Sequence, residues 1–370
     1  MSHNLCETDL SGNEKKYLSE CIDTGWVSSK GPFVERFEKA WAEYCGTKYA
    51  VACSSGTNAL VLALAAAGVT HGSKVIVPEF TMVATAWAVT YLGATPVFVD
   101  CGDDLNIDPD KIEQAIFGDV RDDFEYADMP DKSFKAIIPV HIYGRPCKMD
   151  RIMQIAKKYN LAVIEDAAEA HGATFQGKKV GTIGKAGCFS LFGNKIISSG
   201  EGGIIVTDDE EVDFKLRKLR SMWFDDDHTF YHPHLAYNFR MTNLQAAVAL
   251  AQTERIAYFL GKRQMIRAWY DWKLKQYTIP RPDGSVMWFY DIVLPDRETR
   301  DRVREGLKQM GIETRVFFKP MSDQPMYGGV KRELKARDFS ERGIYLPCHP
   351  GMTESEVRHI SDMVCHLLTQ

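Results

Sequence analysis

The chain has 370 residues, 45% of them hydrophobic and 26% charged, a composition typical of globular proteins. Its net charge of −5 and the lack of a basic block argue against nucleic acid as the main partner. The longest apolar run, residues 59–69, is too short to cross a bilayer, and the N-terminus has no signal-peptide pattern. We therefore expect a cytoplasmic protein with no membrane partner.

The first two-thirds of the chain alternate short apolar runs with segments of helical length. Strands are expected at residues 49–53, 74–78, 96–100, 135–142, 161–166, 187–192 and 203–207. Helices are expected between them, among others at 57–67, 81–92 and 149–159. This alternation predicts an α/β fold with a mainly parallel sheet between helices, and it places the ligand at the carboxyl ends of the strands.

The last third predicts a smaller α/β domain. A long helical pattern runs from residue 242 to 272, followed by a strand at 288–294 and helices at 296–310 and 354–368. We expect a large domain over residues 1–245, and a connecting helix with a small domain over 246–370. The polar stretch 118–133 is expected to be a surface excursion of the large domain.

Two residues carry the most specific chemical signal. Lys195 follows a short apolar run and precedes the glycine-rich turn 200–203, and Asp166 ends the apolar run of the strand at 161–166. A buried amine that faces a buried carboxylate suits a Schiff-base cofactor, because the amine bonds to an aldehyde while the carboxylate holds a protonated ring nitrogen.

Other motifs bear on the same site or suggest a different chemistry. The sequence Ser-Ser-Gly-Thr-Asn-Ala-Leu at 54–60 opens a helix after a strand, which suits either phosphate binding or a plain helix cap; beside Lys195 and Asp166, phosphate is favoured. His141 and His171 follow strand ends and either contact substrate or lie in the core. No metal site is expected, because the nine cysteines include no Cys-x-x-Cys pair and the histidine cluster at 228–234 lies in a loop.

Several motifs follow one another in the order of a known family. They are Val-Pro-Glu-Phe-Thr at 77–81, Glu-Asp-Ala-Ala-Glu-Ala-His-Gly at 165–172, Ser-Leu-Phe-Gly-Asn-Lys at 190–195, Gly-Glu-Gly-Gly at 200–203 and Tyr-Asn-Phe-Arg-Met-Thr-Asn-Leu-Gln-Ala-Ala at 237–247, with the stretch at 54–60 before them. With these motifs the chain resembles the DegT/DnrJ/EryC1/StrS sugar aminotransferases, which have the fold type I (aspartate aminotransferase) architecture. The segments at 311–320 and 345–353 look most like members of the GDP-perosamine synthase type.

The resemblance implies an enzyme that uses pyridoxal 5'-phosphate to move an amino group from glutamate to a nucleotide-linked keto-sugar. The substrate expected from the tail is GDP-4-keto-6-deoxymannose, for a surface polysaccharide. Lys195 would bond to the cofactor and Asp166 would pair with its ring nitrogen. Further cofactor contacts would come from Gly56, Thr57, Ser190, Glu169 and, across a homodimer, Asn238 of the neighbouring subunit.

The remaining implied roles concern the substrate and the face of the cofactor ring. Ser28, His141 and Arg315 are expected to contact the substrate. Met82 stands where the family usually has an aromatic residue that stacks on the cofactor, and its thioether is expected to cover the ring instead. Alternatives within the resemblance are an aminotransferase for a UDP- or dTDP-linked sugar with the keto group at another ring position, a sugar dehydratase, and a non-catalytic regulatory protein.

Overall fold

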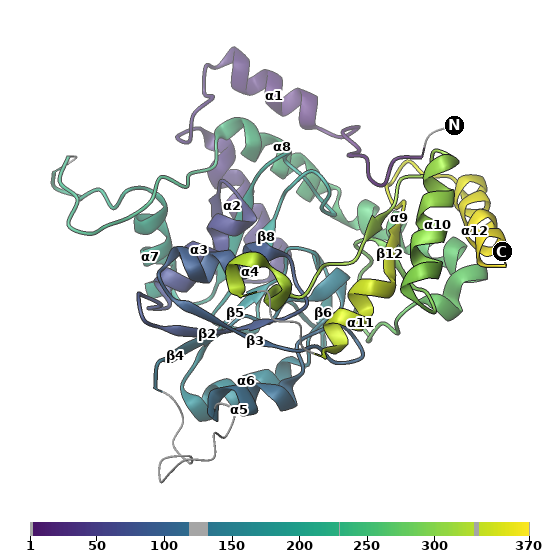
Figure 1. Ribbon diagram of the computed structural model, residues 1–370. Coiled ribbons are helices and arrows are strands. Elements are labelled where there is room, and N and C mark those ends of the chain that lie inside the picture. The colour runs from purple at the N-terminus through teal and green to yellow at the C-terminus, as the bar shows by residue number, and fades with distance from the viewer. Residues whose placement is uncertain (1–2, 118–131, 229, 329–332, 370) are drawn as a thin grey trace, which may run out of the picture.

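The computed structural model describes residues 3–117, 132–228, 230–328 and 333–369. Almost all of the polar stretch expected as a surface excursion, residues 118–133, lies outside these ranges. The described residues form a larger body around a central sheet and a smaller body toward the C-terminus (Figure 1).

The central sheet has the order β1-β9-β8-β5-β4-β2-β3 in the described residues. Its strands are β1 (Tyr49–Cys53), β2 (Lys74–Pro78), β3 (Thr95–Val99), β4 (Phe134–Ile137), β5 (Ala162–Asp166), β8 (Ala186–Ser190) and β9 (Gly203–Thr207). Strand β9 runs antiparallel to both neighbours, and the other pairs are parallel. The expected α/β class with a mainly parallel sheet is therefore confirmed.

Helices cover both faces of this sheet (Figure 1). Neighbouring strand residues alternate between two cores, so that Val75 and Val77 belong to one hydrophobic cluster and Ile76 to the other. One face is covered by α5 (Pro109–Phe117) and α6 (Met149–Tyr159). The other is covered by α2 (Pro32–Cys45), α3 (Gly56–Ala66), α4 (Val83–Tyr91) and α7 (Glu210–Arg220). Helix α8 (Asn243–Glu254) packs on α2, and α1 (Glu14–Asp23) packs on α8.

The long helix expected from residue 242 to 272 is instead two helices, α8 and α9 (Ile256–Leu274). Thr242 and Gln245 start α8 with a reciprocal capping box. The break falls at Arg255, whose guanidinium forms two hydrogen bonds with Asp9, at 3.1 and 3.2 Å. Helix α8 packs on the large body and α9 on the closing helix. The boundary expected between residues 245 and 246 falls inside α8, and the domain division stays a prediction.

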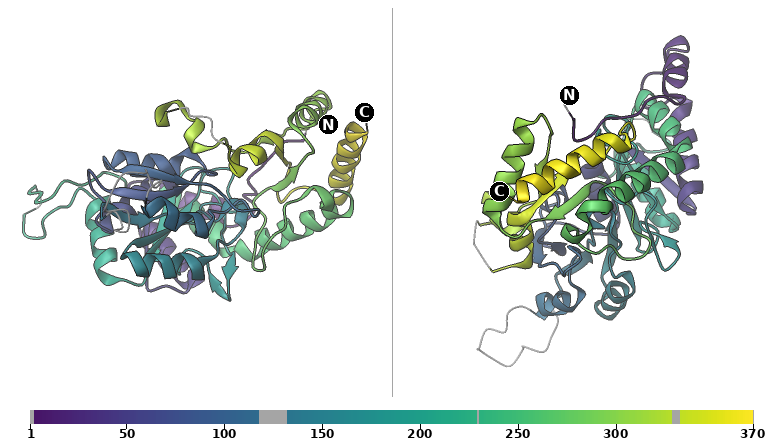
Figure 2. Two further views of the ribbon diagram at one scale, coloured as in Figure 1. Left: turned by 60° about the horizontal axis from the view of Figure 1, so that its bottom comes forward. Right: turned by 90° about the vertical axis from the view of Figure 1, so that its right-hand side faces the viewer.

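The smaller body is coloured green to yellow in Figure 2. It has an antiparallel sheet in the order β10-β12-β11. Its elements are β10 (Tyr290–Val293), α10 (Arg297–Gln309), β11 (Arg315–Val316), α11 (Lys335–Arg342), β12 (Gly343–Leu346) and α12 (Glu354–Leu368). A small hairpin of β6 (Thr174–Phe175) and β7 (Lys178–Lys179) belongs to the large body. Short 3-10 turns are η1 (Ile142–Gly144), η2 (Lys275–Tyr277), η3 (Met321–Asp323) and η4 (Pro325–Tyr327). Among the described helices, none has both the length and the apolar character needed to span a membrane.

Candidate active site

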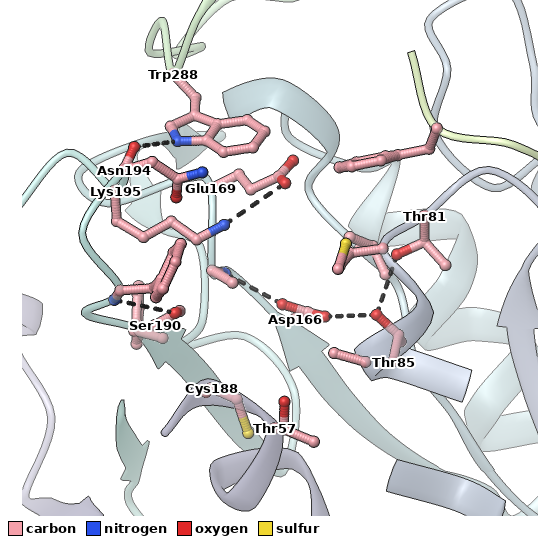
Figure 3. A pocket seen from close by; sticks show the side chains of 18 of the residues that line it. Thr57, Thr81, Thr85, Asp166, Glu169, Cys188, Ser190, Asn194, Lys195 and Trp288 are labelled. Carbon is pink, nitrogen blue, oxygen red and sulfur yellow. Dashed lines mark hydrogen bonds and ion pairs between the residues drawn. The ribbon is translucent and has the colours of Figure 1, made fainter. Parts of the chain in front are cut away.

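A cavity of about 400 Å³ lies where the carboxyl ends of β5 and β8 meet the first turn of α3, the first turn of α4 and the smaller body. Asp166, Lys195 and, from the smaller body, Trp288 line it (Figure 3). Tyr345 of the smaller body lines it as well. The sheet thus brings together two residues that stand 29 positions apart in sequence (166 to 195).

Asp166 is held in one orientation at the end of β5. Its Oδ2 accepts a hydrogen bond from the Thr85 hydroxyl at 2.8 Å, and its Oδ1 accepts one from the amide of Ala168 at 3.1 Å. Thr81 supports Thr85 from one helical turn away, at 3.0 Å between the hydroxyls (Figure 3). Burial raises the pKa of Asp166, while these hydrogen bonds and the charge of Lys195 oppose the rise. The carboxyl group is therefore positioned to receive a cationic partner from the cavity.

The amine of Lys195 lies on the opposite side of the cavity from the Thr85–Asp166 pair (Figure 3). Its Nζ is 3.6 Å from Oε1 of Glu169 and 4.2 Å from the centre of the Trp288 ring. Glu169 is buried, and its other oxygen accepts a hydrogen bond from the amide of Tyr143 at 3.0 Å. Desolvation raises the pKa of Glu169 to about 7, against the opposing effect of Lys195.

The first turn of α3 forms a small anion cradle at the floor of the cavity. Ser55 caps the helix by accepting a hydrogen bond from the amide of Asn58 at 3.1 Å, and Gly56 and Thr57 begin the first turn. A Cβ added at Gly56 would lie 2.7 Å from Cβ of Ser190, so only glycine allows the helix to approach this strand end. The helix N-terminus, its free amides and the Ser190 hydroxyl suit a phosphate group.

These residues fit pyridoxal phosphate on the geometry of the chain itself. A phosphate cradle, an amine and a buried carboxylate line one cavity whose volume suits a cofactor of this size. Gly56, Thr57 and Ser190 would hold the phosphate, Asp166 the ring nitrogen and Lys195 the aldehyde carbon.

Comparison with known proteins identifies the family. The family model described as the DegT/DnrJ/EryC1/StrS aminotransferase family matches residues 8–365. The chain belongs to this family. It is 44% identical to the GDP-perosamine synthase of Caulobacter vibrioides over 95% of the chain and 94% of that protein, and 36% identical to the GDP-perosamine synthase of Escherichia coli O157:H7 over 97% and 96%. The solved structure of PseC of Helicobacter pylori, an aminotransferase involved in the biosynthesis of pseudoaminic acid, matches with a TM-score of 0.90 at 27% identity and covers 100% of both chains.

As a member of the DegT/DnrJ/EryC1/StrS family, the protein is a pyridoxal-phosphate-dependent nucleotide-sugar aminotransferase. The expected family, fold, cofactor and enzyme class are thus confirmed.

The individual site residues of this aminotransferase fall into two groups. Gly56, Thr57, Met82, Asp166, Glu169, Ser190, Lys195 and Arg315 all line the cavity. Ser28 and Asn238 do not; both are exposed, and Asn238 ends the long excursion that follows α7. Their expected contacts with substrate and with the neighbouring subunit's cofactor stay predictions.

The substrate contact expected for His141 stays a prediction, and the structure places its side chain away from the cavity. His141 is fully buried and does not line the cavity. Its Nδ1 accepts a hydrogen bond from the amide of Cys147 at 3.0 Å, so Nε2 carries the proton and donates to Glu165, also at 3.0 Å. Glu165 in turn accepts three backbone amides from residues 181–184. His141 therefore supports the loop behind the sheet. His171 is a core residue as well, packed against Trp41 and Phe189.

Two important residues escaped the sequence analysis. Thr85 holds Asp166, and its only sequence signal was its position four residues after Thr81, which lies just before the start of α4. Trp288 lies 93 positions from Lys195 (195 to 288) in a different body of the molecule, and no local pattern in the sequence connects the two residues.

Proposed function

We propose that this aminotransferase converts GDP-4-keto-6-deoxymannose to GDP-perosamine with glutamate as the amino donor. The observation that carries this proposal is the 44% identity to a GDP-perosamine synthase over nearly the whole of both chains, together with the intact Lys195–Asp166 site. We further propose a homodimer in which Asn238 serves the cofactor of the neighbouring subunit, and we propose that Ser28 contacts the nucleotide sugar. Exposure of both residues outside their own cavity supports this arrangement.

Pyridoxal phosphate supplies an aldehyde that bonds to amines and a ring that withdraws electrons from the carbon that loses its proton. Asp166 would hold the protonated ring nitrogen, and Thr85 keeps the Asp166 carboxylate in place. The Lys195 amine would take the proton from the α-carbon of glutamate. In the second half of the reaction, it would give a proton to the sugar carbon that receives the amino group.

The remaining cavity residues bind and orient. Arg315 lies at the cavity wall on β11, with its side chain 63% exposed, where its guanidinium can receive an anionic group of the nucleotide. Met82 is half exposed and covers the cavity from the start of α4. The nucleotide contributes binding energy at a distance from the reacting carbon.

The direct test is an assay with purified protein, pyridoxal phosphate, glutamate and a panel of GDP-, UDP- and dTDP-linked 3-keto and 4-keto sugars. We expect stoichiometric 2-oxoglutarate, and an aminated GDP sugar detected by mass spectrometry. Amination of a UDP- or dTDP-linked sugar alone would overturn the substrate, and a deoxygenated sugar without 2-oxoglutarate would overturn the aminotransfer.

The Lys195→Ala variant tests the assigned lysine. Because no other amine of the described residues lines the cavity, we expect loss of turnover and of the visible absorbance of the covalently bound cofactor. Absorbance spectra and the 2-oxoglutarate assay measure both. An unchanged spectrum would assign the covalent bond to another lysine.

A further inference from the structure

Trp288 approaches Lys195 from the smaller body, across the cavity from the central sheet (Figure 3). Its indole Nε1 donates a hydrogen bond of 2.8 Å to the carbonyl of Asn194, the residue directly before Lys195. The face of its ring lies 4.2 Å from the Lys195 Nζ. One side chain thus contacts both the backbone at the base of the lysine and the amine at its tip.

The indole is itself fixed from several sides. Trp288 is 3% exposed, and its carbonyl accepts a hydrogen bond from the buried Arg263 of α9. Aromatic rings surround the indole, with centroid distances of 4.6 Å to Phe289, 5.9 Å to Tyr143 and 6.0 Å to Tyr345. A ring packed this tightly has one rotamer, so it offers Lys195 a rigid surface.

We propose that Trp288 is a positioning residue that holds the Lys195 amine for proton transfer. Together with Glu169, 3.6 Å from Nζ, the ring fixes the amine from two directions. The electron-rich indole face attracts a cationic amine, and it does so more strongly in a buried cavity than in water. This inference rests on the aminotransferase function proposed above.

The contact matters because the Lys195 amine gains and loses a proton in each half of the reaction. The protonated amine has little water around it, since the side chain is only 11% exposed. The Trp288 face and the Glu169 carboxylate replace that water. Without the ring, the amine loses a defined position and the aromatic face that shields it from solvent.

Two substitutions separate the contacts of Trp288. Trp288→Phe keeps an aromatic face but removes the Nε1–H, and Trp288→Leu removes both. Trp272→Leu is the matched control, because Trp272 is 60% exposed on α9 and its ring contacts Lys273 and Arg358. We expect kcat to fall about 3-fold in Trp288→Phe and about 10-fold or more in Trp288→Leu, with KM for glutamate within about 2-fold.

A second readout needs no activity. Cofactor-free protein is treated briefly with acetic anhydride, and acetylation of Lys195 is measured by peptide mass spectrometry relative to Lys308, whose side chain is 76% exposed. We expect this ratio to rise about 3-fold or more in Trp288→Leu, to rise less in Trp288→Phe and to stay constant in Trp272→Leu. Melting temperatures recorded in parallel show whether each variant folds.

The outcomes are distinct. If both kcat and the acetylation ratio of a folded Trp288→Phe and Trp288→Leu equal those of the parent protein, the proposal is overturned. An equal effect in Trp272→Leu overturns it as well. If no keto-sugar is aminated but the acetylation ratio responds as expected, the proposed function fails while the contact between Trp288 and Lys195 stands.

Discussion

The negative charge of the Asp166 carboxylate is the feature of this side chain on which we expect activity to depend. Asp166→Asn keeps the size of the side chain and a hydrogen-bond acceptor for Thr85 but removes the charge that holds a proton on the cofactor ring. We expect kcat to fall about 10²- to 10³-fold or more, with the fold intact by circular dichroism. Asp338→Asn, on the exposed surface of α11, is the control and should retain activity. Near-normal turnover of the Asp166→Asn variant would remove Asp166 from its role.

Glu169 makes the free energy of unfolding depend on pH, and its buried environment fixes the sign of this dependence. Its pKa is raised by desolvation to about 7, above the ordinary value of 4.5, so between these values the folded protein binds a proton that the unfolded chain releases. Ionisation of Glu169 therefore destabilises the folded, cofactor-free protein as pH rises from 5 to 8. The side chain in Glu169→Gln cannot ionise. Between pH 5 and pH 8, the free energy of unfolding of this variant should therefore rise by about 1–3 kcal/mol relative to that of the parent protein.

Urea unfolding of the cofactor-free proteins at pH 5 and pH 8 measures this difference. Glu305→Gln is the control, since the Glu305 side chain is 60% exposed, and it should show no comparable gain. If Glu169→Gln is more stable than the parent protein at pH 5 but not at pH 8, the assignment of a buried, neutral Glu169 at low pH is contradicted.

Among the elements, the first turn of α3 has a backbone conformation on which binding of the cofactor phosphate is expected to depend. Gly56→Ala places a methyl group 2.7 Å from Cβ of Ser190, which must push the helix start away from the strand end. We expect affinity for pyridoxal phosphate to fall about 10-fold or more, measured by titration of cofactor-free protein and visible absorbance. Gly261→Ala on α9 meets no atom within 4 Å and is the control.

Elements with a strong local pattern were predicted well from the sequence. Strands β1, β2 and β9 and helices α6 and α12 have the expected bounds, because each combines a clear hydrophobic period with a turn or cap at its ends. The strand expected at 135–142 ends at Ile137, because Pro139 has no amide hydrogen to donate to a sheet. At the break between α8 and α9, Arg255 is hydrogen-bonded to Asp9, which is far away in sequence, and local periodicity could not reveal this contact.

At the scale of the whole molecule, the relation between the two bodies was beyond the sequence. Arg145, which follows β4, is fully buried and donates to Asp291 of β10 at 2.5 Å, and Arg281 shares the same carboxylate. The contact of Trp288 with Lys195 is of the same kind. Such contacts join segments with no shared period or motif, so pattern analysis predicted the residues of each body but not the cavity wall between them.

The proposed homodimer can be tested by mixing two inactive variants. Lys195→Ala lacks the reacting amine, and Asn238→Ala lacks the residue proposed to serve the neighbouring site. If Asn238 acts across the interface, a mixed dimer has one site with Lys195 from one subunit and Asn238 from the other, and this site is complete. Random 1:1 assembly makes half of the dimers mixed with one working site each, so we expect about a quarter of parent activity after co-refolding. If Asn238 instead serves its own subunit, each mixed dimer has one site without Lys195 and one without Asn238, and the mixture stays as inactive as its components.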